Sequence, residues 1–322
     1  MSDTRVSDDR MTDARVSDDR MDPADHGRTD PVVVRRVRLG NLTTLKVGGE
    51  AELWTVNDAA GLRAATREDY YVLGAGSNLL VSDDGVPARV IRLGHAFATL
   101  DEVDGRRDLW LGAATPVPGL VRRAQRLGLS GLEGLLGVPA QLGGAVVMNA
   151  GTRFGCLADT LHEVEVMLDG SLERLSARAL GLRYRHSELP AGAVVTRVRL
   201  RLTASTPARV QALMDQVDAA RKGQPKVKSA GCAFKNPPGD SAGRLIDAAG
   251  CQGLRVGDAM ISPDHANFVV NLGAATTADV LALLALVQQR VDQPLELEWR
   301  RWGLPGGDAP QPGWQRTERD AV

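Results

Sequence analysis

The segment from Gly134 to Gly151 constrains the fold of this 322-residue chain more than any other part. Five glycines, one proline and one asparagine fall within its eighteen residues. This composition disfavours both helix and strand, because glycine and proline destabilise the interior of either. Long segments without regular structure are uncommon in compact domains and are usually functional. The sequence therefore predicts a loop whose backbone lies close to a large ligand.

A second glycine-containing segment, Leu73 to Leu80, follows an apolar run that is typical of a buried strand. Its two glycines, followed by a serine and an asparagine, offer closely spaced backbone N–H groups to a phosphate. The segment is not the dinucleotide motif Gly-x-Gly-x-x-Gly, because Asn78 and Leu79 stand where the third glycine and the start of a helix are expected. A tight turn between two strands explains the pattern as well.

Composition excludes several classes of protein. The net charge of −1 indicates no basic face for nucleic acid, and the longest apolar run, Val280 to Val287, is too short to span a bilayer. No apolar signal-peptide core is present near the N-terminus, so we expect a cytoplasmic protein. The three cysteines are too few and too scattered for a disulfide framework or a zinc site, and we expect no metal.

Length and local composition suggest two domains with a tail at each end. Residues 1–30 carry a near-repeat of ten residues and few core-forming side chains, which predicts a disordered tail. We expect a first domain over residues 31–205, a second over 206–303, and a loose, Pro/Gly-rich C-terminal tail over 304–322.

Apolar periodicity predicts a mixture of strands and helices along the chain. Strands are expected over 32–39, 51–56, 70–73, 90–93, 109–111, 163–168, 194–202 and 295–300. Helices are expected over 62–68, 116–127, 210–221, 244–249 and 276–290. Thr115 is the expected N-cap of the second helix, and Thr276 with Asp279 forms an expected capping box for the last.

The segment from Ser229 to Pro237 places a proton-bearing thiol, Cys232, directly after a glycine. Lys235 and Asn236 follow and suit an anion and a hydrogen-bonding group on a ligand. A polar turn that carries an inert buried thiol is the alternative.

Three further segments carry polar groups whose simpler interpretation is structural. Arg183 and Arg185 surround Tyr184 and suit a carboxylate or an enolate, but without further context a surface ion-pair cluster is the preferred interpretation. Glu296 and Glu298 share one face of an expected strand, as exposed carboxylates often do. A lone histidine beside a strand, at position 265, is expected to be structural.

In this order the motifs resemble the UDP-N-acetylenolpyruvoylglucosamine reductase (MurB) family of flavoenzymes. The resemblance covers about residues 41 to 303 and rests on Asn41–Gly49, Leu73–Leu80, Gly134–Gly151, Tyr184–Ser187, Gly231–Pro237, His265–Phe268 and Leu297–Arg300. The short connection between the glycine-rich segment and Tyr184 is similar to the branch of the family that lacks an extra tyrosine-bearing loop.

The resemblance implies an α+β protein. Its FAD-binding domain would be of the vanillyl-alcohol-oxidase type, made of two α+β lobes, and a smaller α/β substrate-binding domain would follow. FAD would be bound non-covalently and reduced by NADPH, and the reduced flavin would convert UDP-N-acetylglucosamine enolpyruvate to UDP-N-acetylmuramate. This reaction belongs to peptidoglycan synthesis, and so to cell-wall biogenesis, cell shape and division. The protein would act as a monomer. The implied FAD-binding residues are Gly74, Ala75, Gly76, Ser77, Asn78, Leu79, Gly137, Val138, Pro139, Gly143, Gly144, Ala145, Asn149 and Gly151.

The family's catalytic positions match Arg185, Cys232 and Glu298. The resemblance implies that the arginine and a protonated glutamate stabilise an enolic intermediate and that the cysteine donates a proton. The positions that contact substrate or NADPH match Tyr184, Arg221, Lys235 and Asn236.

The chain departs from the family pattern at two places. Many members have serine where Cys232 stands, and the thiol predicts a retained role with greater sensitivity to oxidation. Ala140 and Gln141 replace the usual glycine and hydroxyl residue, which affects local FAD contacts. An oxidase on the same scaffold and a flavin-binding sensor are the alternative functions, and the presence of all three catalytic positions disfavours both.

Overall fold

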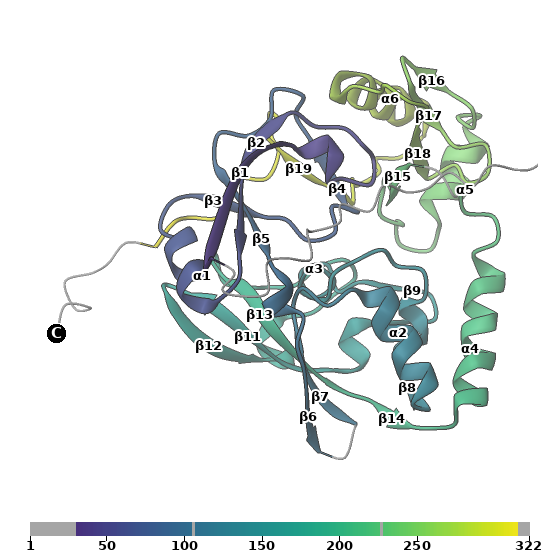
Figure 1. The fold of residues 1–322 in the computed structure, drawn as a ribbon. Coiled ribbons are helices and arrows are strands. Elements are labelled where there is room, and N and C mark those ends of the chain that lie inside the picture. Colours follow the sequence, from purple (N-terminus) through teal and green to yellow (C-terminus); the bar gives the residue numbers. More distant parts are fainter. Residues whose placement is uncertain (1–29, 105–106, 226–227, 315–322) are drawn as a thin grey trace, which may run out of the picture. The chain divides into compact units, whose positions relative to one another are not determined.

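A computed structural model of the protein describes residues 30–104, 107–225 and 228–314. The predicted disordered tail therefore lies outside the described residues, except for Asp30, as does the end of the predicted C-terminal tail. Within the described ranges, no helix is both long and apolar enough to cross a membrane. Strands and helices are mixed along the chain (Figure 1), which confirms the predicted α+β class.

The first sheet has four strands in the order β1-β2-β5-β3. Its members are β1 (Val32–Arg38), β2 (Glu50–Val56), β5 (Arg89–Leu93) and β3 (Tyr70–Val72). Helix α1 (Ala59–Ala65) begins three residues before the predicted start at 62, because the Asp58 side chain accepts a hydrogen bond from the Gly61 N–H and caps it there.

The second sheet has five antiparallel strands in the order β12-β11-β13-β7-β6. These are β12 (Ser171–Ser176), β11 (Leu161–Leu168), β13 (Val194–Arg201), β7 (Asp108–Gly112) and β6 (Leu100–Asp104). Apolar residues of this sheet and of helix α2 (Val117–Arg126) share one core. Thr115 does not cap α2 as predicted; Pro116 is the N-cap residue, and the buried Thr115 hydroxyl has no hydrogen-bond partner among the described residues.

The glycine-rich segment contains more regular structure than its composition predicts. A 3-10 helix, Glu133–Leu135, lies at its start and helix α3 (Leu142–Val147) in its middle. The Leu142 and Gly143 N–H groups donate to the carbonyls of Thr115 and Ala113, so contacts from another segment fix the first turn of α3 despite the glycines. Short strands β9 (Gly151–Thr152) and β10 (Gly155–Cys156) follow as a hairpin.

Helix α4 (Pro207–Ala220) leads from the second sheet to a third one (Figure 1). That sheet has the order β15-β18-β17-β16, with β15 (Ser229–Cys232), β18 (Phe268–Asn271), β17 (Ala259–Ile261) and β16 (Arg255–Val256). Helices α5 (Ala242–Ala248) and α6 (Thr277–Arg290) complete a separate apolar core. The predicted capping box of Thr276 and Asp279 is confirmed at the start of α6.

The chain then returns to the region of the first sheet. Strand β19 (Arg300–Trp302) pairs in parallel with β4 (Leu79–Val81), directly after the glycine loop. The predicted strand over 295–300 is wrong in extent, since residues 295–299 make only an isolated bridge between Leu297 and Phe234. The two-stranded pair of β8 (Leu129–Ser130) and β14 (Thr203–Ala204) precedes α4.

Residues 304–314 differ from the loose tail that their composition predicts. Gln311 pairs with Tyr70 through two backbone hydrogen bonds, and the Trp314 N–H donates to the Thr66 carbonyl. Proline and glycine here permit an irregular path whose polar groups are nevertheless satisfied by other segments.

Candidate active site

A cavity of about 690 Å³ lies among the glycine-containing segments, the start of β13 and the third sheet. Its volume is within the range of cavities that enclose cofactors and other small ligands. The segments that line it come from positions 71–79, 138–154, 185–195, 220–224, 230–243, 265–268 and 298–311. The cavity therefore brings together both glycine-containing segments and all three predicted catalytic residues.

The loop between β3 and β4 offers a row of free backbone donors to this cavity. In the described structure, no acceptor takes the N–H groups of residues 74–78. The loop is held from outside, because the Gly76 carbonyl accepts hydrogen bonds from the Thr44 N–H at 3.0 Å and the Thr44 hydroxyl at 3.4 Å. Gly76 has φ +63°, and a Cβ atom there would lie 2.3 Å from the Leu42 carbonyl oxygen. Consecutive unpaired N–H groups suit a pyrophosphate, so this loop fits the phosphates of FAD.

The second glycine-containing segment forms the facing wall. Nothing lies within 4 Å of the position that a Cβ atom of Gly144 would occupy, and Gly143 lies against Ala113. Ala140 and Gln141 also line the cavity. Ala140 does not adopt a positive φ, and the Gln141 amide oxygen lies 3.7 Å from the position of a Cβ atom on Gly74. The two departures from the family pattern therefore fit locally without backbone strain.

A tight turn positions Arg185. The Arg183 and His186 backbones exchange hydrogen bonds across it, and Arg185 adopts φ +54°, a left-handed conformation that is costly for a residue with a side chain. The Asn149 side chain donates to the Arg183 carbonyl at 3.0 Å, and the Ser187 hydroxyl donates to the Val147 carbonyl at 2.9 Å. Contacts from the glycine-rich segment thus hold this strained turn in place.

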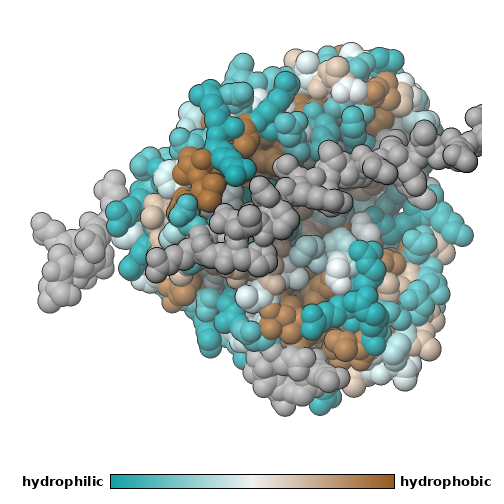
Figure 2. Space-filling model, viewed as in Figure 1, coloured by the Kyte–Doolittle hydropathy of each residue, from teal (hydrophilic) through white to brown (hydrophobic). Residues whose placement is uncertain are grey.

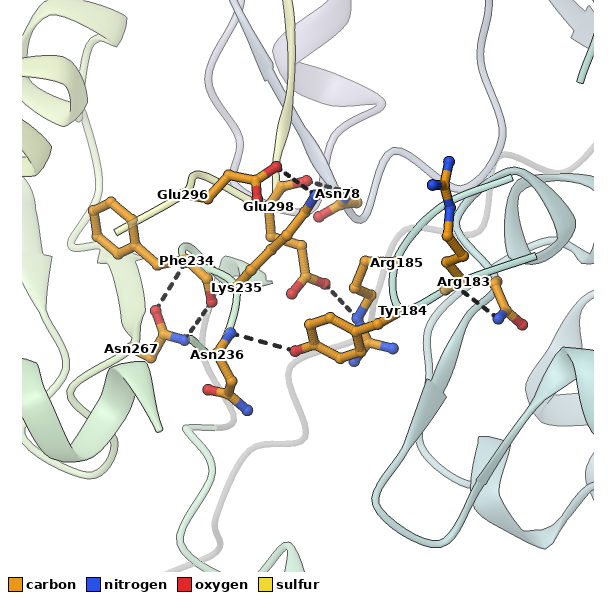
Figure 3. A network of polar contacts seen from close by, with 11 residues as sticks. Asn78, Arg183, Tyr184, Arg185, Phe234, Lys235, Asn236, Asn267, Glu296 and Glu298 are labelled. Atoms are coloured by element: carbon orange, nitrogen blue, oxygen red, sulfur yellow. Dashed lines mark hydrogen bonds and ion pairs between the residues drawn. The ribbon is translucent and has the colours of Figure 1, made fainter. Parts of the chain in front are cut away.

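Arg185 and Glu298 point toward each other from different segments of the chain (Figure 3). The Arg185 Nε atom donates to Glu298 Oε1 at 2.8 Å, and both side chains are largely buried, with exposed fractions of 21% and 11%. Burial raises the pKa of Glu298, and the positive charge of Arg185 only partly opposes that rise. Glu298 therefore holds a proton more readily than an ordinary glutamate, and the pair can act as charge and hydrogen-bond donor together.

Backbone pairing brings Cys232 to this pair. The Glu298 N–H donates to the Ala233 carbonyl, and the Lys235 N–H donates to the Glu296 carbonyl. A register shift between Ser229 and Cys232 in β15, with Gly231 at φ +73°, marks a bulge directly before Cys232, which lines the cavity.

The environment of Cys232 favours the protonated form of its thiol. Burial raises its pKa to about 12, the charge of Glu298 adds to the rise, and the charges of Arg185 and Arg221 oppose it. A thiol in this state has a proton to give.

The residues predicted to contact substrate surround this centre. Arg221 donates to the Gly137 carbonyl at 3.1 Å, and its burial lowers its pKa. The Tyr184 hydroxyl accepts the Asn236 N–H at 3.4 Å (Figure 3). Lys235 pairs with Glu296 at 2.6 Å. Arg221 and Asn236 line the cavity, whereas Tyr184 and Lys235 lie outside its lining.

His265 lines the cavity as well, which the sequence interpretation did not anticipate. Its ring contacts Phe268 edge-on with centroids 4.8 Å apart, its Nδ1 atom accepts the Asn267 N–H at 3.2 Å, and burial lowers its pKa. Asn267 holds both backbone groups of Phe234, two residues after Cys232. The described ranges contain no group of three or more His, Cys, Asp or Glu side chains that could hold a metal.

The predicted cofactor-binding residues divide into two groups. Residues 74–79, 138, 139, 143, 144 and 151 line the cavity. Gly137, Ala145 and Asn149 do not, and Asn149 instead supports the turn of Arg185. Sequence reasoning missed Thr152, Arg153 and Phe154, which continue the predicted segment, and Asp308, Ala309 and Gln311, for which the sequence carries no ligand-binding signal.

Comparisons with known proteins agree with this geometry. A model described as an FAD binding domain matches residues 55–176, and one for the C-terminal domain of UDP-N-acetylenolpyruvoylglucosamine reductase matches residues 224–300. The reductase of that name from Thermus thermophilus is 60% identical over 84% of this chain and 99% of its own. The reductase from Deinococcus radiodurans is 53% identical over 84% and 96%.

A solved structure gives the same result. The crystal structure of UDP-N-acetylenolpyruvylglucosamine reductase (MurB) from Thermus caldophilus is 59% identical, with a TM-score of 0.80 over 84% of this chain and 99% of that one. The FAD-binding domain and the cavity thus define the class of the protein as an FAD-dependent oxidoreductase. Within that class, the chain belongs to the UDP-N-acetylenolpyruvoylglucosamine reductase (MurB) family.

Proposed function

We propose that the protein reduces UDP-N-acetylglucosamine enolpyruvate to UDP-N-acetylmuramate, with NADPH as the reductant. This reaction is a step of peptidoglycan synthesis. One observation carries the proposal: the Arg185–Glu298 pair and a protonated Cys232 line the same cavity as five unpaired N–H groups of the glycine loop. A phosphate-binding wall and an acid–base centre in one cavity suit a flavin reductase. When bound, FAD carries hydride from NADPH to the vinyl carbon of the enolpyruvyl group.

Arg185 and Glu298 are proposed to stabilise the enolic intermediate. Negative charge develops on the carboxylate side of the substrate when hydride arrives, and a fixed guanidinium at that point lowers the barrier. The raised pKa of Glu298 favours the protonated form, which can donate a second hydrogen bond. The strained φ of Arg185 and its contact with Glu298 hold the guanidinium in place before substrate binds.

Cys232 is proposed to donate the proton that completes the lactyl group. Hydride and proton add across the carbon–carbon double bond, so the vinyl carbon becomes a methyl group and the neighbouring carbon gains the proton from sulfur. The thiolate left behind lies near Arg185 and Arg221, whose charges stabilise it until solvent returns the proton.

Four further residues are proposed to hold the substrate or NADPH. Arg221 and Lys235 suit the phosphates, since both are cations near the catalytic centre. Tyr184 and Asn236, which already contact each other, suit the hydroxyl and amide groups of the sugar.

The remaining expectations concern the localisation, the oligomeric state and the cellular role of the enzyme. We propose a cytoplasmic monomer with roles in cell-wall biogenesis, cell shape and division. The large exposed apolar side chains of the described residues are scattered along the chain, and Figure 2 shows apolar side chains as separate patches among hydrophilic ones on one face. Such a surface supports a monomer.

An anaerobic visible spectrum tests the function. NADPH should bleach the flavin band of the purified protein, and the enolpyruvyl substrate should restore it. Peroxide formation with an alcohol would indicate an oxidase, and binding without turnover would indicate a sensor. Acid precipitation should leave the yellow colour in solution, because we expect non-covalent FAD; colour in the pellet would overturn that expectation.

A further inference from the structure

The segment from Asp308 to Trp314, here named the C-terminal strap, lies beyond residue 300, where the match to the family model ends. Asp308, Ala309 and Gln311 of this strap line the cavity. The strap therefore adds a wall to the proposed cofactor site.

Gln311 joins the two sheets of the FAD-binding region. Its backbone N–H donates to the Tyr70 carbonyl at 2.6 Å, and its carbonyl accepts the Tyr70 N–H at 3.0 Å, at the edge of the first sheet. Its side-chain Oε1 accepts the Gly192 N–H at 2.9 Å, just before β13 of the second sheet. The Tyr70 hydroxyl donates to the Gly192 carbonyl at 2.8 Å and closes this arrangement.

Both ends of the strap are anchored. The Asp308 N–H donates to the Arg301 carbonyl at 2.7 Å, and its side chain accepts the Arg301 N–H at 2.7 Å. At the other end, the Trp314 indole donates to the Arg63 carbonyl at 3.1 Å, and the Gly313 N–H donates to Asp69 at 3.0 Å. The strap is thus held to α1, β3 and β19 rather than resting on the surface.

The strap lies apart from strand β15, which carries the catalytic cysteine. Figure 1 shows the yellow C-terminal segment beside α1 and β3 at the left, and β15 toward the upper right. Cys232 is the last residue of β15. A bound FAD that presents its flavin to Cys232 and its pyrophosphate to the glycine loop must direct its adenosine away from β15. In that arrangement the adenosine end would reach toward the strap.

Gln311 also carries an unused donor. Because its Oε1 atom accepts the Gly192 N–H, the amide nitrogen is the remaining polar atom, and no acceptor for it occurs among the described residues. Adenosine presents ring nitrogens and ribose hydroxyls, which accept such hydrogen bonds.

We propose that the C-terminal strap forms the adenosine end of the FAD site and that the Gln311 amide nitrogen donates a hydrogen bond to the adenosine. This inference rests on the proposed function, in which the cavity holds FAD. It assigns cofactor binding to a segment whose composition resembles a loose tail.

The test compares two flavins on the apoprotein, because FMN has the same ring system as FAD but no adenosine. Gln311→Glu keeps the acceptor for Gly192 and removes the amide donor. It should raise the Kd for FAD about three- to tenfold, the usual range for one lost hydrogen bond, and leave the Kd for FMN unchanged. A chain that ends at Gly307 should lose more FAD affinity, again with little change for FMN. Quenching of flavin fluorescence measures both constants.

Gln288→Glu is the matched control. The Gln288 side chain also joins two backbone groups, since its amide donates to Gln293 and accepts from Leu295, but the residue lies outside the cavity lining. This variant should leave both flavin affinities unchanged.

Equal Kd values for FAD in the wild type and in Gln311→Glu would overturn the assignment of the donor, and an unchanged FAD affinity in the shortened chain would overturn the role of the strap. A parallel loss of FMN affinity would mean that the strap supports the fold and not the adenosine. Failure of the wild type to bind either flavin would instead contradict the proposed function.

Discussion

Two arginine–carboxylate clusters in this protein shift the pKa of their carboxyl groups in opposite directions. Arg199 donates two hydrogen bonds to Asp108, at 2.7 and 2.8 Å, within the second sheet. Its third nitrogen reaches Glu163 at 2.5 Å, and Arg201 adds a further contact to Asp108. These contacts lower the pKa of Asp108 below its ordinary value.

The Arg185–Glu298 pair in the cavity makes fewer hydrogen bonds. Arg185 makes a single hydrogen bond to Glu298, and burial raises the pKa of that carboxyl. Because the guanidinium is not fully used and the carboxyl is not fully compensated, both retain capacity for a ligand. A saturated pair, whose charged atoms have their hydrogen-bond partners, stabilises the fold. An unsaturated pair, some of whose charged atoms lack such partners, is available for chemistry when it lies beside a cavity.

Replacement of each arginine by lysine should produce the largest difference between the two clusters, in the rate of flavin reoxidation. Arg185→Lys should lower the rate of flavin reoxidation by the enolpyruvyl substrate roughly 10²- to 10³-fold with little change in KM, because lysine keeps the charge but not the planar donor. Arg199→Lys should leave that rate near the wild-type value. Stopped-flow absorbance measures it, and equal losses in both half-reactions of Arg185→Lys would identify a structural arginine.

Replacing each carboxyl by its amide should change the free energy of unfolding by different amounts. The Asp108 carboxylate accepts three hydrogen bonds from arginines. Asp108→Asn removes its negative charge and should therefore lower the free energy of unfolding by about 2 kcal/mol. Glu298→Gln resembles the protonated form that burial favours and should change it by less than about 0.5 kcal/mol. Urea unfolding monitored by circular dichroism tests both, and a larger loss for Glu298→Gln would reverse the comparison.

The pH dependence of these two effects should have opposite signs. The folded-state pKa of Asp108 is lowered, so its stabilisation is present above the ordinary value of 3.8 and is lost as the pH falls through the folded pKa. The folded-state pKa of Glu298 is raised, so its contribution is present below 4.5 and is lost as the pH rises. The Tm deficit of Asp108→Asn should therefore shrink in acid, and Glu298→Gln should gain relative to wild type as the pH rises; parallel trends would contradict this.

The smallest effect is expected from the N-terminal segment. Deletion of residues 1–30, which carry the near-repeat and few core-forming side chains, should leave the Tm and the activity within error. Such a shortened chain would provide a simpler background for the arginine comparison. A fall of several degrees in Tm would show that the segment docks on the folded protein.

Local signals explain which parts of the structure were predictable. The capping box at Thr276 and the apolar runs of the sheets depend on neighbours in sequence, and the structure confirms them. Helix α3 was not predicted because carbonyls of Ala113 and Thr115, distant in sequence, fix its first turn. The order of C-terminal residues 304–314 was missed for the same reason, since its partners are Tyr70, Gly192 and Arg63.

The candidate site shows the same division. Arg185 and Glu298 are separated by 113 residues, and either could have belonged to an ordinary surface cluster. Only the family resemblance joined them to Cys232 before the fold was known. The pKa of the thiol depends on burial and on charges from three segments, so no sequence pattern could give it.

The most direct test of the account concerns Cys232 as the proton donor beside the unsaturated pair. Stopped-flow absorbance should show near-normal flavin reduction by NADPH in Cys232→Ala, with reoxidation by the enolpyruvyl substrate slowed about 10²-fold or more. Cys232→Ser should restore most of that rate, because a hydroxyl in the same place carries a proton. Reoxidation of Cys232→Ala at the wild-type rate, with solvent deuterium entering the product in one stereochemistry, would show that the proton comes from another group.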